Sequence, residues 1–514
     1  MGRRSLGWGI GLVAFGLVPL GLIAPGGGGG TLTGATGIFA ADQLQYLAWV
    51  RDLGTSLLAR NSFDLAPSSH VFVEPVFALS GALVRLGVSP AWAYDLWLPV
   101  AAVALALAYR SYTHRLVAQP AALAAALLLA LFATSPLAPL LDSVAGLSPG
   151  RHNQLALAVA DLTPALQLWG YFPIAIALAL VCVSLLAVER AIDPARRAPG
   201  RAARSELLLA GVSGALAAWL HPWQGATLLL ILGGLWVTER TRRAALVYGG
   251  VSLAVCLPLA YYLALGQLDE AWSAARSQND AVSFEPWAIA ATLGPLALAA
   301  LAGARRPGRE VQERVLVIWP LAALALYLLD PPYAIHALET ATLPLAILAV
   351  RGGRRLRLNG PAAVVLILLA TEPGLIFAGT LLDKALDEHR GGYLVSRDDA
   401  RALRALERSP SAGGVLAPTP IASAVPAYTG RATWLGHPSW TPGYRRREAE
   451  ANRLFSGRMS EPAARRLVAS SGARFVLAPC GSSPAIGRIV RSLTSEGNTR
   501  FGCATLIKLA QPHT

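Results

Sequence analysis

The stretch Leu168–Arg204, LWGYFPIAIALALVCVSLLAVERAIDPARRAPGRAAR, decides the fold class. Its first part, 168–188, is almost continuously apolar, and a helix that crosses a membrane needs roughly 20 such residues. Its second part is rich in arginine, as loops on the cytoplasmic side of a membrane are. The stretch therefore predicts a transmembrane helix that ends in a basic cytoplasmic loop.

The composition of the whole chain indicates the same class. Of its 514 residues, 54% are hydrophobic and 14% are charged, whereas an average soluble domain is about 25% charged. A mean hydropathy of +0.48 is too high for a chain that must cover itself with polar surface. These values exclude a soluble globular protein, a disordered protein and a nucleic-acid binder. The net charge of +14 is therefore assigned to loops that orient a multi-pass membrane protein.

About eleven segments are apolar and long enough to be candidate membrane spans. The first is interpreted as an anchor and not as a signal peptide, because no small-residue cleavage site precedes Pro25. The segments are Leu6–Pro25, Trp92–Arg110, Ala118–Leu141, Leu168–Val188, Leu207–Leu220, Trp223–Val237, Ala244–Leu265, Trp287–Ala304, Val315–Leu329, Leu338–Val350 and Pro361–Leu382.

The orientation of the chain depends on Val71–Val88, a short apolar segment that contains Glu74 and Arg85. If this segment does not cross, every basic cluster falls on the cytoplasmic side, as the positive-inside rule requires. We therefore predict an inner (plasma) membrane protein with a cytoplasmic N-terminus and an extracytoplasmic C-terminus. The clusters are Arg3–Arg4, Arg110–Arg115, Arg190–Arg204, Arg240–Arg243, Arg305–Arg314 and Arg351–Arg357.

The sequence divides into a transmembrane domain, residues 1–382, and an extracytoplasmic domain, residues 383–514. In the second domain, short apolar runs bounded by Gly and Pro predict strands at 415–417, 474–478 and 504–509. Helices are predicted at 396–408, 445–456 and 461–471, so a small α/β domain is expected. Cys480 and Cys503 lie in this domain, and the sequence is compatible with a disulfide or with two free thiols.

The first outer loop, residues 26–91, gathers ionisable residues on the outer side. Residues 38–58 have the pattern of an amphipathic helix that lies on the membrane surface, and Asp52 is expected on its solvated face. Asp42 lies at the start of this helix, beside Gln43 and one turn before Tyr46. Ionisable residues at membrane depth are functional candidates by default, and Asp42 is the leading one.

Three segments of this region follow one another as Ala41-Asp42-Gln43-Leu44-Gln45-Tyr46, Val73-Glu74-Pro75-Val76-Phe77 and Gly87-Val88-Ser89-Pro90-Ala91. This order resembles the GT-C class of integral membrane glycosyltransferases, in particular its bacterial mannosyltransferase-like and aminoarabinose transferase-like branch. The resemblance implies a polytopic α-helical fold with interfacial helices in the first outer loop. It also implies transfer of a sugar from a polyprenyl-phosphate carrier to an extracytoplasmic acceptor, with Asp42 as general base or metal-associated acid.

Two positions differ from the pattern of the class. Gln43 stands where many members have Glu, and Glu74-Pro75-Val76 stands where many have Lys-Pro-Pro. These differences favour an alternative function, a non-catalytic GT-C-like scaffold in envelope biosynthesis. A transporter is a further alternative, but transporters place polar groups near the bilayer midplane and often have two related halves, and this sequence has neither feature.

The chemistry of glycosyl transfer assigns roles to polar residues of the outer side. The acceptor hydroxyl loses a proton to a carboxylate, and Asp42 is the candidate for this role. The leaving lipid phosphate needs positive charge, which Arg151 could supply. A divalent metal ion, Mg²⁺ or Mn²⁺, held by Asp42 with Glu74 or His70, is the other possibility.

Three further histidines complete the predicted substrate-binding set of Gln43, Tyr46, His70, Glu74, Arg151, His221, His336 and His437. His221 lies at a tight outer turn and either caps that turn or contacts the donor sugar or phosphate. His437, within a Gly-His-Pro loop of the tail, either contacts the acceptor or lies in a surface turn. Glu339, in apolar surroundings, is either neutral and hydrogen-bonded or lines the cavity. The expected partners are a lipid-linked sugar donor, membrane lipid and an extracytoplasmic glycan or protein acceptor.

Overall fold

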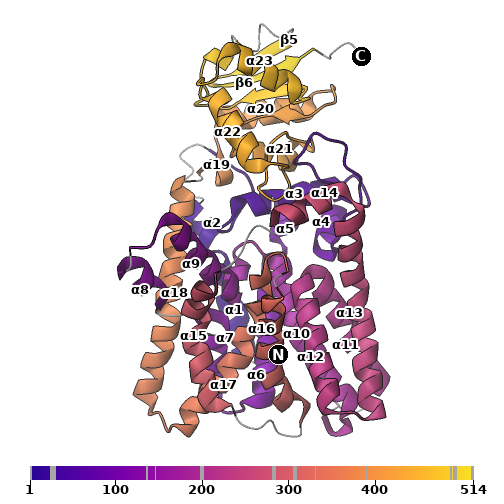
Figure 1. The fold of residues 1–514 in the computed structure, drawn as a ribbon, viewed down its shortest axis with the longest axis vertical. Helices are drawn as coiled ribbons and strands as arrows, with labels where there is room; N and C mark the ends of the chain where they lie inside the picture. The colour runs from indigo at the N-terminus through magenta and orange to yellow at the C-terminus, as the bar shows by residue number, and fades with distance from the viewer. Residues whose placement is uncertain are drawn as a thin grey trace. The chain divides into compact units, whose positions relative to one another are not determined.

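The structure, a computed structural model, describes residues 3–23, 30–134, 137–144, 146–196, 202–279, 285–304, 310–329, 331–388, 390–486, 489 and 495–510. Residues 197–201 and 305–309 of the predicted basic loops lie outside the described residues, as do residues 24–29 at the start of the first outer loop. The chain forms two compact units, each assembled from separate stretches of sequence (Figure 1).

The first unit is helical and comprises Met1–Leu17, Trp97–Leu263 and Asp280–Asp383. Figure 1 shows its long helices side by side, with α10 packed on α11 and α11 on α12. Its elements are α1 (Arg3–Gly16), α6 (Trp97–Leu116), α7 (Pro120–Phe132), α8 (Leu137–Val144), α9 (Pro149–Leu162), η2 (Pro164–Leu168), α10 (Phe172–Ile192), η3 (Pro194–Arg196), α11 (Ala203–Leu220), α12 (Pro222–Thr238), α13 (Arg242–Leu268), α15 (Pro286–Gly303), α16 (Val311–Leu328), η4 (Ala334–Ala341), α17 (Thr342–Arg355) and α18 (Gly360–Glu388).

Helices occur at every predicted span, which confirms a polytopic helical fold. Within the described part of the chain, six are long and apolar enough to cross a membrane: Pro90–Leu116, Phe172–Ile192, Arg242–Leu268, Pro286–Gly303, Val311–Leu328 and Ala334–Arg355. The predicted first span is divided at Leu17 into α1 and α2 (Val18–Ile23). Gly16 and Pro19 flank this break, and both residue types weaken a helix. The total of about eleven spans stays a prediction.

Arginine and glutamate side chains pair at one end of the helical unit. Arg115 bonds Glu189 at 2.6 Å and Glu310 at 2.7 Å, and Arg351 bonds Glu313 at 2.8 Å. These residues lie in or directly beside four of the basic clusters, which are 110–115, 190–204, 305–314 and 351–357. The clusters therefore lie at the same end of this unit, as the predicted topology requires, and the assignment of that end to the cytoplasm stays a prediction.

The second unit joins the first outer loop to the tail, and comprises Val18–Leu96, Ala264–Asn279 and Lys384–Thr514. Strand β1 (Thr31–Leu32) of the loop pairs antiparallel with β2 (Leu394–Val395) of the tail. The unit changes after Asp383, next to the predicted domain boundary, but the loop 26–91, assigned by the sequence to the transmembrane domain, groups with the tail. The other elements that lie wholly in this unit before the tail are α2, α3 (Ala40–Leu53), α4 (Pro75–Arg85), α5 (Pro90–Asp95) and α14 (Glu270–Asn279).

The two principal helices of the first loop, α3 and α4, pack on each other. A Cβ added at Gly81 would lie 2.8 Å from the carbonyl oxygen of Leu53, so only glycine permits this approach. Helix α4 has 11 residues and spans about 17 Å, less than the roughly 30 Å core of a bilayer. This length agrees with the prediction that Val71–Val88 does not cross.

The helix predicted at 38–58 is shorter than expected. It ends at Leu53 because the residues that follow, Gly54, Thr55 and Ser56, are weak helix formers. Leu57, expected on the apolar stripe, is 80% exposed. The polar residues of α3 are not all on a solvated face either, since several pack inside the unit. The buried residues of α3 include Gln43, Gln45 and Trp49 as well as leucines.

The tail folds as the predicted α/β domain. Strands β3 (Val415–Leu416), β4 (Phe475–Ala478), β5 (Ser495–Phe501) and β6 (Ala504–Leu509) form a sheet in the order β3-β4-β6-β5, with only β3 and β4 parallel among the described strands of this sheet. Its helices are α19 (Arg390–Tyr393), α20 (Arg397–Arg408), α21 (Ile421–Thr429), α22 (Tyr444–Phe455) and α23 (Glu461–Ser470). Strand β5 and helix α21 were not predicted from the sequence.

Helices cover both faces of this sheet, because side chains alternate along each strand. Phe475 and Leu477 pack with residues of α20 and α21, and Val476 and Ala478 pack with residues of α22 and α23. The loops at the ends of the strands are thereby held in place, including the Gly-His-Pro loop that follows β3 and α21.

Candidate functional site

Asp42 and His437 form a hydrogen-bonded pair within the second unit. Asp42 lies in the first turn of α3, and its Oδ1 is 2.8 Å from Nε2 of His437. The Asp42 side chain is 35% exposed, whereas that of His437 is 4% exposed. The helix N-terminus stabilises a carboxylate in this position. The pair therefore presents a partly accessible carboxylate whose orientation is set by a buried imidazole.

The other ring nitrogen of His437 fixes which atom carries the proton. The backbone N–H of Ser439 lies 3.1 Å from Nδ1 and can only donate, so Nδ1 accepts. Nε2 consequently carries the proton, and this N–H group donates a hydrogen bond to Oδ1 of Asp42. A neutral His437 in this tautomer leaves the negative charge on Asp42.

The loop that carries His437 is itself held by hydrogen bonds. Thr441 Oγ1 accepts the backbone N–H groups of Gly436 at 3.1 Å and of His437 at 3.3 Å, and it donates to the carbonyl oxygen of Phe63 at 3.0 Å. Ser423 Oγ donates to the carbonyl oxygen of Gly436 at 2.6 Å. His437 is therefore pre-organised toward Asp42 by a loop that the first loop and the tail both support.

The neighbours of Asp42 on α3 have structural contacts. Gln43 is 1% exposed, and its Oε1 accepts the backbone N–H groups of Thr36 at 2.5 Å and of Gly37 at 3.0 Å. The ring of Tyr46 packs 5.2 Å from that of Phe77. Gln43 thus shapes the turn that leads into α3, and its predicted contact with substrate stays a prediction, as does that of Tyr46.

Glu74 and His70 are directed to partners other than a shared metal ion. Glu74 is 2% exposed and caps α4, where its oxygens accept the N–H groups of Val76 at 3.4 Å and of Phe77 at 3.1 Å. Burial raises the pKa of Glu74 to about 8. His70 Nε2 lies 3.4 Å from Oδ1 of Asp52. Among the described residues, groups of three or more metal-ligating side chains that converge do not include Asp42 or Glu74. A site with fewer protein ligands is not tested by this, because magnesium is often held by only one or two carboxylates, so the predicted Mg²⁺ or Mn²⁺ at Asp42 stays a prediction.

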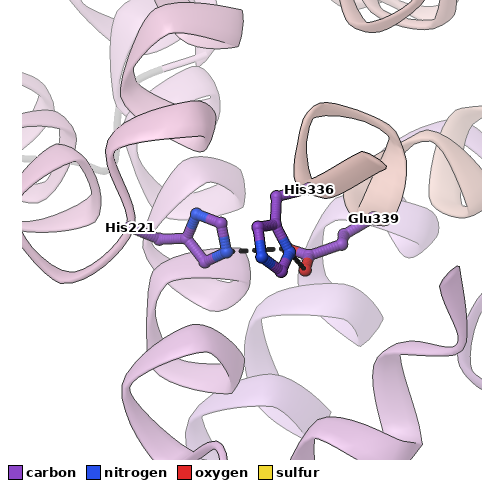
Figure 2. A group of neighbouring side chains, drawn as sticks. All are labelled: His221, His336 and Glu339. Atoms are coloured by element: carbon purple, nitrogen blue, oxygen red, sulfur yellow. Dashed lines mark hydrogen bonds and ion pairs between the residues drawn. The ribbon is translucent and has the colours of Figure 1, made fainter. Parts of the chain in front are cut away.

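His221, His336 and Glu339 converge in the first unit (Figure 2). Glu339 is fully buried, with Oε2 3.0 Å from Nε2 of His221 and Oε1 2.7 Å from Nδ1 of His336. His221 lies between α11 and α12, where Pro222 begins the second helix. His336 and Glu339 are three residues apart in η4, and side chains at this spacing in a 3₁₀ helix lie on the same side.

A chain of hydrogen bonds supports this group. Gln224 Nε2 donates to Oε2 of Glu339 at 3.4 Å and to the carbonyl oxygen of His336 at 2.6 Å. Thr340 Oγ1 donates to Oε1 of Gln224 at 2.8 Å, and Trp319 Nε1 donates to Thr340 at 2.9 Å. Glu339 is thus hydrogen-bonded, as one of the two expectations for it stated, and the neutral state expected with that hydrogen bonding stays a prediction.

The remaining residues from the sequence analysis are Arg151 and the two cysteines of the tail. Arg151 is exposed on α9, in the first unit. Cys480 and Cys503 form a disulfide with their Cα atoms 4.9 Å apart, which settles the alternative left open by the sequence. Asp42 and His437 belong to the second unit, whereas Arg151, His221 and His336 belong to the first.

Sequence reasoning missed the supporting residues Gln224 and Thr340 and the partnership of Asp42 with His437. The partners in that pair are 395 residues apart, so no local pattern connects them. A local signal did exist for Glu339, since it follows His336 at the spacing of one 3₁₀ turn in an apolar segment.

The fold can be compared with those of known proteins. No protein-family model matches the chain, and no curated protein matches it. The apo crystal structure of the Archaeoglobus fulgidus oligosaccharyltransferase is similar, with a TM-score of 0.51 and 13% identity over 92% of this chain and 69% of that one. The same enzyme tethered to an acceptor peptide that contains an NVT sequon gives a TM-score of 0.51 and 12% identity, with the same coverage of both chains.

A bacterial structure is comparable in length. ArnT from Cupriavidus metallidurans, bound to undecaprenyl phosphate, has a TM-score of 0.49 and 14% identity, with 98% of each chain covered. The helical unit and the helices of the first loop match the architecture that the resemblance in the first loop implied. The chain is an integral membrane protein with a GT-C-like fold.

Proposed function

We propose that this protein is a glycosyltransferase that moves a sugar from a polyprenyl-phosphate carrier to an acceptor outside the cytoplasm. The observation that carries the proposal is the pair of Asp42 and His437, in which a carboxylate is oriented by a neutral, buried imidazole at 2.8 Å. The GT-C-like fold supports it, as does the order of motifs in the first outer loop.

In the proposed reaction, an acceptor hydroxyl oxygen forms a bond to the anomeric carbon of the donor sugar. The bond between that carbon and the phosphate oxygen breaks, and its electron pair leaves with the polyprenyl phosphate. Asp42 takes the proton of the hydroxyl as general base. His437 does not take this proton. Its Nε2–H group donates a hydrogen bond to Oδ1 of Asp42 and thereby fixes the orientation of the carboxylate, so that Oδ2 is the oxygen proposed to accept the proton.

The acceptor and the side of the membrane belong to the same proposal. The archaeal enzyme of similar fold is an oligosaccharyltransferase that has been tethered to an acceptor peptide, so a protein or glycan acceptor is proposed here. The Cys480–Cys503 disulfide supports an extracytoplasmic location of the tail, because disulfides persist in oxidising compartments. The cytoplasmic N-terminus and the inner membrane are proposed from the distribution of arginine.

The test replaces Asp42 with asparagine, which keeps the size of the side chain and removes its basicity. Purified protein in lipid nanodiscs is assayed for sugar transfer with a panel of polyprenyl-phosphate sugars and with envelope glycan and protein acceptors. Asp42→Asn is expected to lower kcat about 100-fold or more, the usual contribution of a general base.

Asp52→Asn is the matched control, because Asp52 lies on the same helix and pairs with His70 instead of His437. It is expected to keep activity. Equal product from Asp42→Asn and the wild type, at equal protein level, would refute the assignment. Absence of transfer with every donor and acceptor in the wild type would favour the non-catalytic scaffold.

A further inference from the structure

The group formed by His221, His336 and Glu339 has the composition of a transition-metal site. We propose that these three side chains bind a divalent cation of the zinc class, with a fourth position open to water or to an anionic oxygen. Two imidazoles with one carboxylate form a recurrent ligand set of zinc sites that keep an open position. This proposal does not depend on the proposed transferase activity.

The geometry brings the ligand atoms together before any ion is bound. One nitrogen of each histidine and one oxygen of Glu339 all lie within 4.8 Å of one another. Ligand atoms that surround one zinc ion at about 2.1 Å are about 3.4 Å apart. The contacts of 3.0 Å and 2.7 Å run to the two different oxygens of Glu339. To admit an ion these contacts must widen slightly, and the widest separation in the group, at most 4.8 Å, must shorten by at most about 1.4 Å. Figure 2 shows that the two rings approach the carboxylate from separate chain segments.

The ligand types favour zinc over the Mg²⁺ or Mn²⁺ predicted from the sequence. Magnesium and manganese prefer oxygen ligands, whereas imidazole suits zinc and its neighbours in the transition series. Only one of the three side chains offers oxygen. The ion that this group selects is therefore chemically different from the ion expected at Asp42.

The surroundings fix the carboxylate and leave one histidine able to change its tautomer. Gln224 orients Glu339, as residues behind a metal ligand commonly do. His221 is 2% exposed, and its Nδ1 has no hydrogen-bond partner among the described residues. An ionised carboxylate at Glu339 can only accept, so Nε2 of His221 then carries the proton. Because Nδ1 has no competing partner among the described residues, the proton can move to Nδ1 and leave Nε2 to bind a metal ion.

A second convergent group does not compete for the metal ion. Asp398, Cys480 and Cys503 lie close together, but both sulfur atoms belong to the disulfide. A cysteine binds metal as a thiolate, and a disulfide offers none. Among the described residues, the histidine and glutamate group is therefore the better candidate.

The experiment measures zinc bound to the full-length protein, purified in detergent with an affinity tag that contains no histidine. Protein is stripped with a chelator, exposed to a small excess of ZnCl₂, desalted, and analysed by inductively coupled plasma mass spectrometry. The wild type is expected to retain about one zinc ion per chain, and Glu339→Gln and His336→Ala to retain almost none. Gln224→Ala, which loses only the supporting contact, is expected to bind zinc about 10- to 100-fold more weakly.

His114→Ala is the matched control, because His114 is an exposed histidine of the same unit. It is expected to bind zinc like the wild type. Zinc should also raise the unfolding temperature of the wild type and of His114→Ala but not that of Glu339→Gln, provided each elutes as a monodisperse protein. A wild type that retains no zinc, or variants that retain it equally, would overturn the proposal.

Discussion

Glu74 offers a test that needs no substrate. It caps α4 with both carboxylate oxygens and is 2% exposed, and this burial raises its pKa from 4.5 to about 8. The perturbation is Glu74→Gln, which does not ionise and keeps one oxygen that can accept the N–H group of Phe77, whereas the carboxylate uses its other oxygen for Val76. The variant therefore removes the cost of burying a charge and retains part of the cap.

The sign and size of the effect follow from the pKa. Because the pKa of Glu74 is higher in the folded than in the unfolded chain, its contribution to stability is fully present below about pH 4.5. That contribution is lost as the pH rises through about 8. At about 1.4 kcal/mol for each pKa unit, the whole interval corresponds to about 5 kcal/mol. Glu74→Gln removes this dependence and is expected to be more stable than the wild type at pH 9.

The assay is thermal unfolding of the full-length protein in nanodiscs between pH 5 and pH 9. The unfolding temperature of the wild type is expected to fall more steeply with pH than that of Glu74→Gln, and the two curves should converge near pH 5. Asp52→Asn, in the same loop, is the control and should follow the wild type. Parallel curves for the wild type and Glu74→Gln would refute the assignment of Glu74 as a buried, neutral cap at low pH.

Two further predictions concern the tail. His437→Ala removes a hydrogen bond to a charged group worth about 1.5–3 kcal/mol, so kcat in the transfer assay should fall about 10- to 100-fold with little change in KM. In His437→Gln the amide nitrogen can replace Nε2 opposite Asp42, so this variant should recover part of the lost kcat. Equal losses of kcat in both variants would contradict a positioning role. Replacing Cys480 and Cys503 by serine opens a loop with a separation of 23 residues and should cost about 3 kcal/mol. Limited proteolysis of the tail should be faster in this double variant, and an unchanged rate would contradict the estimate.

The elements that the sequence predicted well are those with a strong local pattern. Long apolar runs give helices at every predicted span, and the strands near 415 and 475 are short apolar runs between glycines and prolines. Strand β5, Ser495–Phe501, was missed because its residues are mostly polar and its only described strand partner is β6. An edge strand has less need of an apolar face, so its pattern is weak.

The site was predictable only in its local part. Asp42 stands out because an acidic residue at the start of a helix beside the first span is unusual in so apolar a chain. Its partner His437 is 395 residues away, and only the folding of the first loop onto the tail brings them together. The sequence did not indicate that Glu74 caps a helix or that Gln43 accepts backbone hydrogen bonds in a turn. Any acidic or amide side chain near a free N–H group can take such a role.

The proposed reaction also requires positive charge at the leaving phosphate, and the predicted outer side has few cations. His221 and His336 do not meet this need by themselves, because both bond the carboxylate of Glu339. With neutral rings the group has a charge of −1, and one protonated ring brings it only to zero. A divalent ion bound to the same three side chains changes the charge to +1. Whether this group or Arg151 contacts the leaving phosphate stays a proposal.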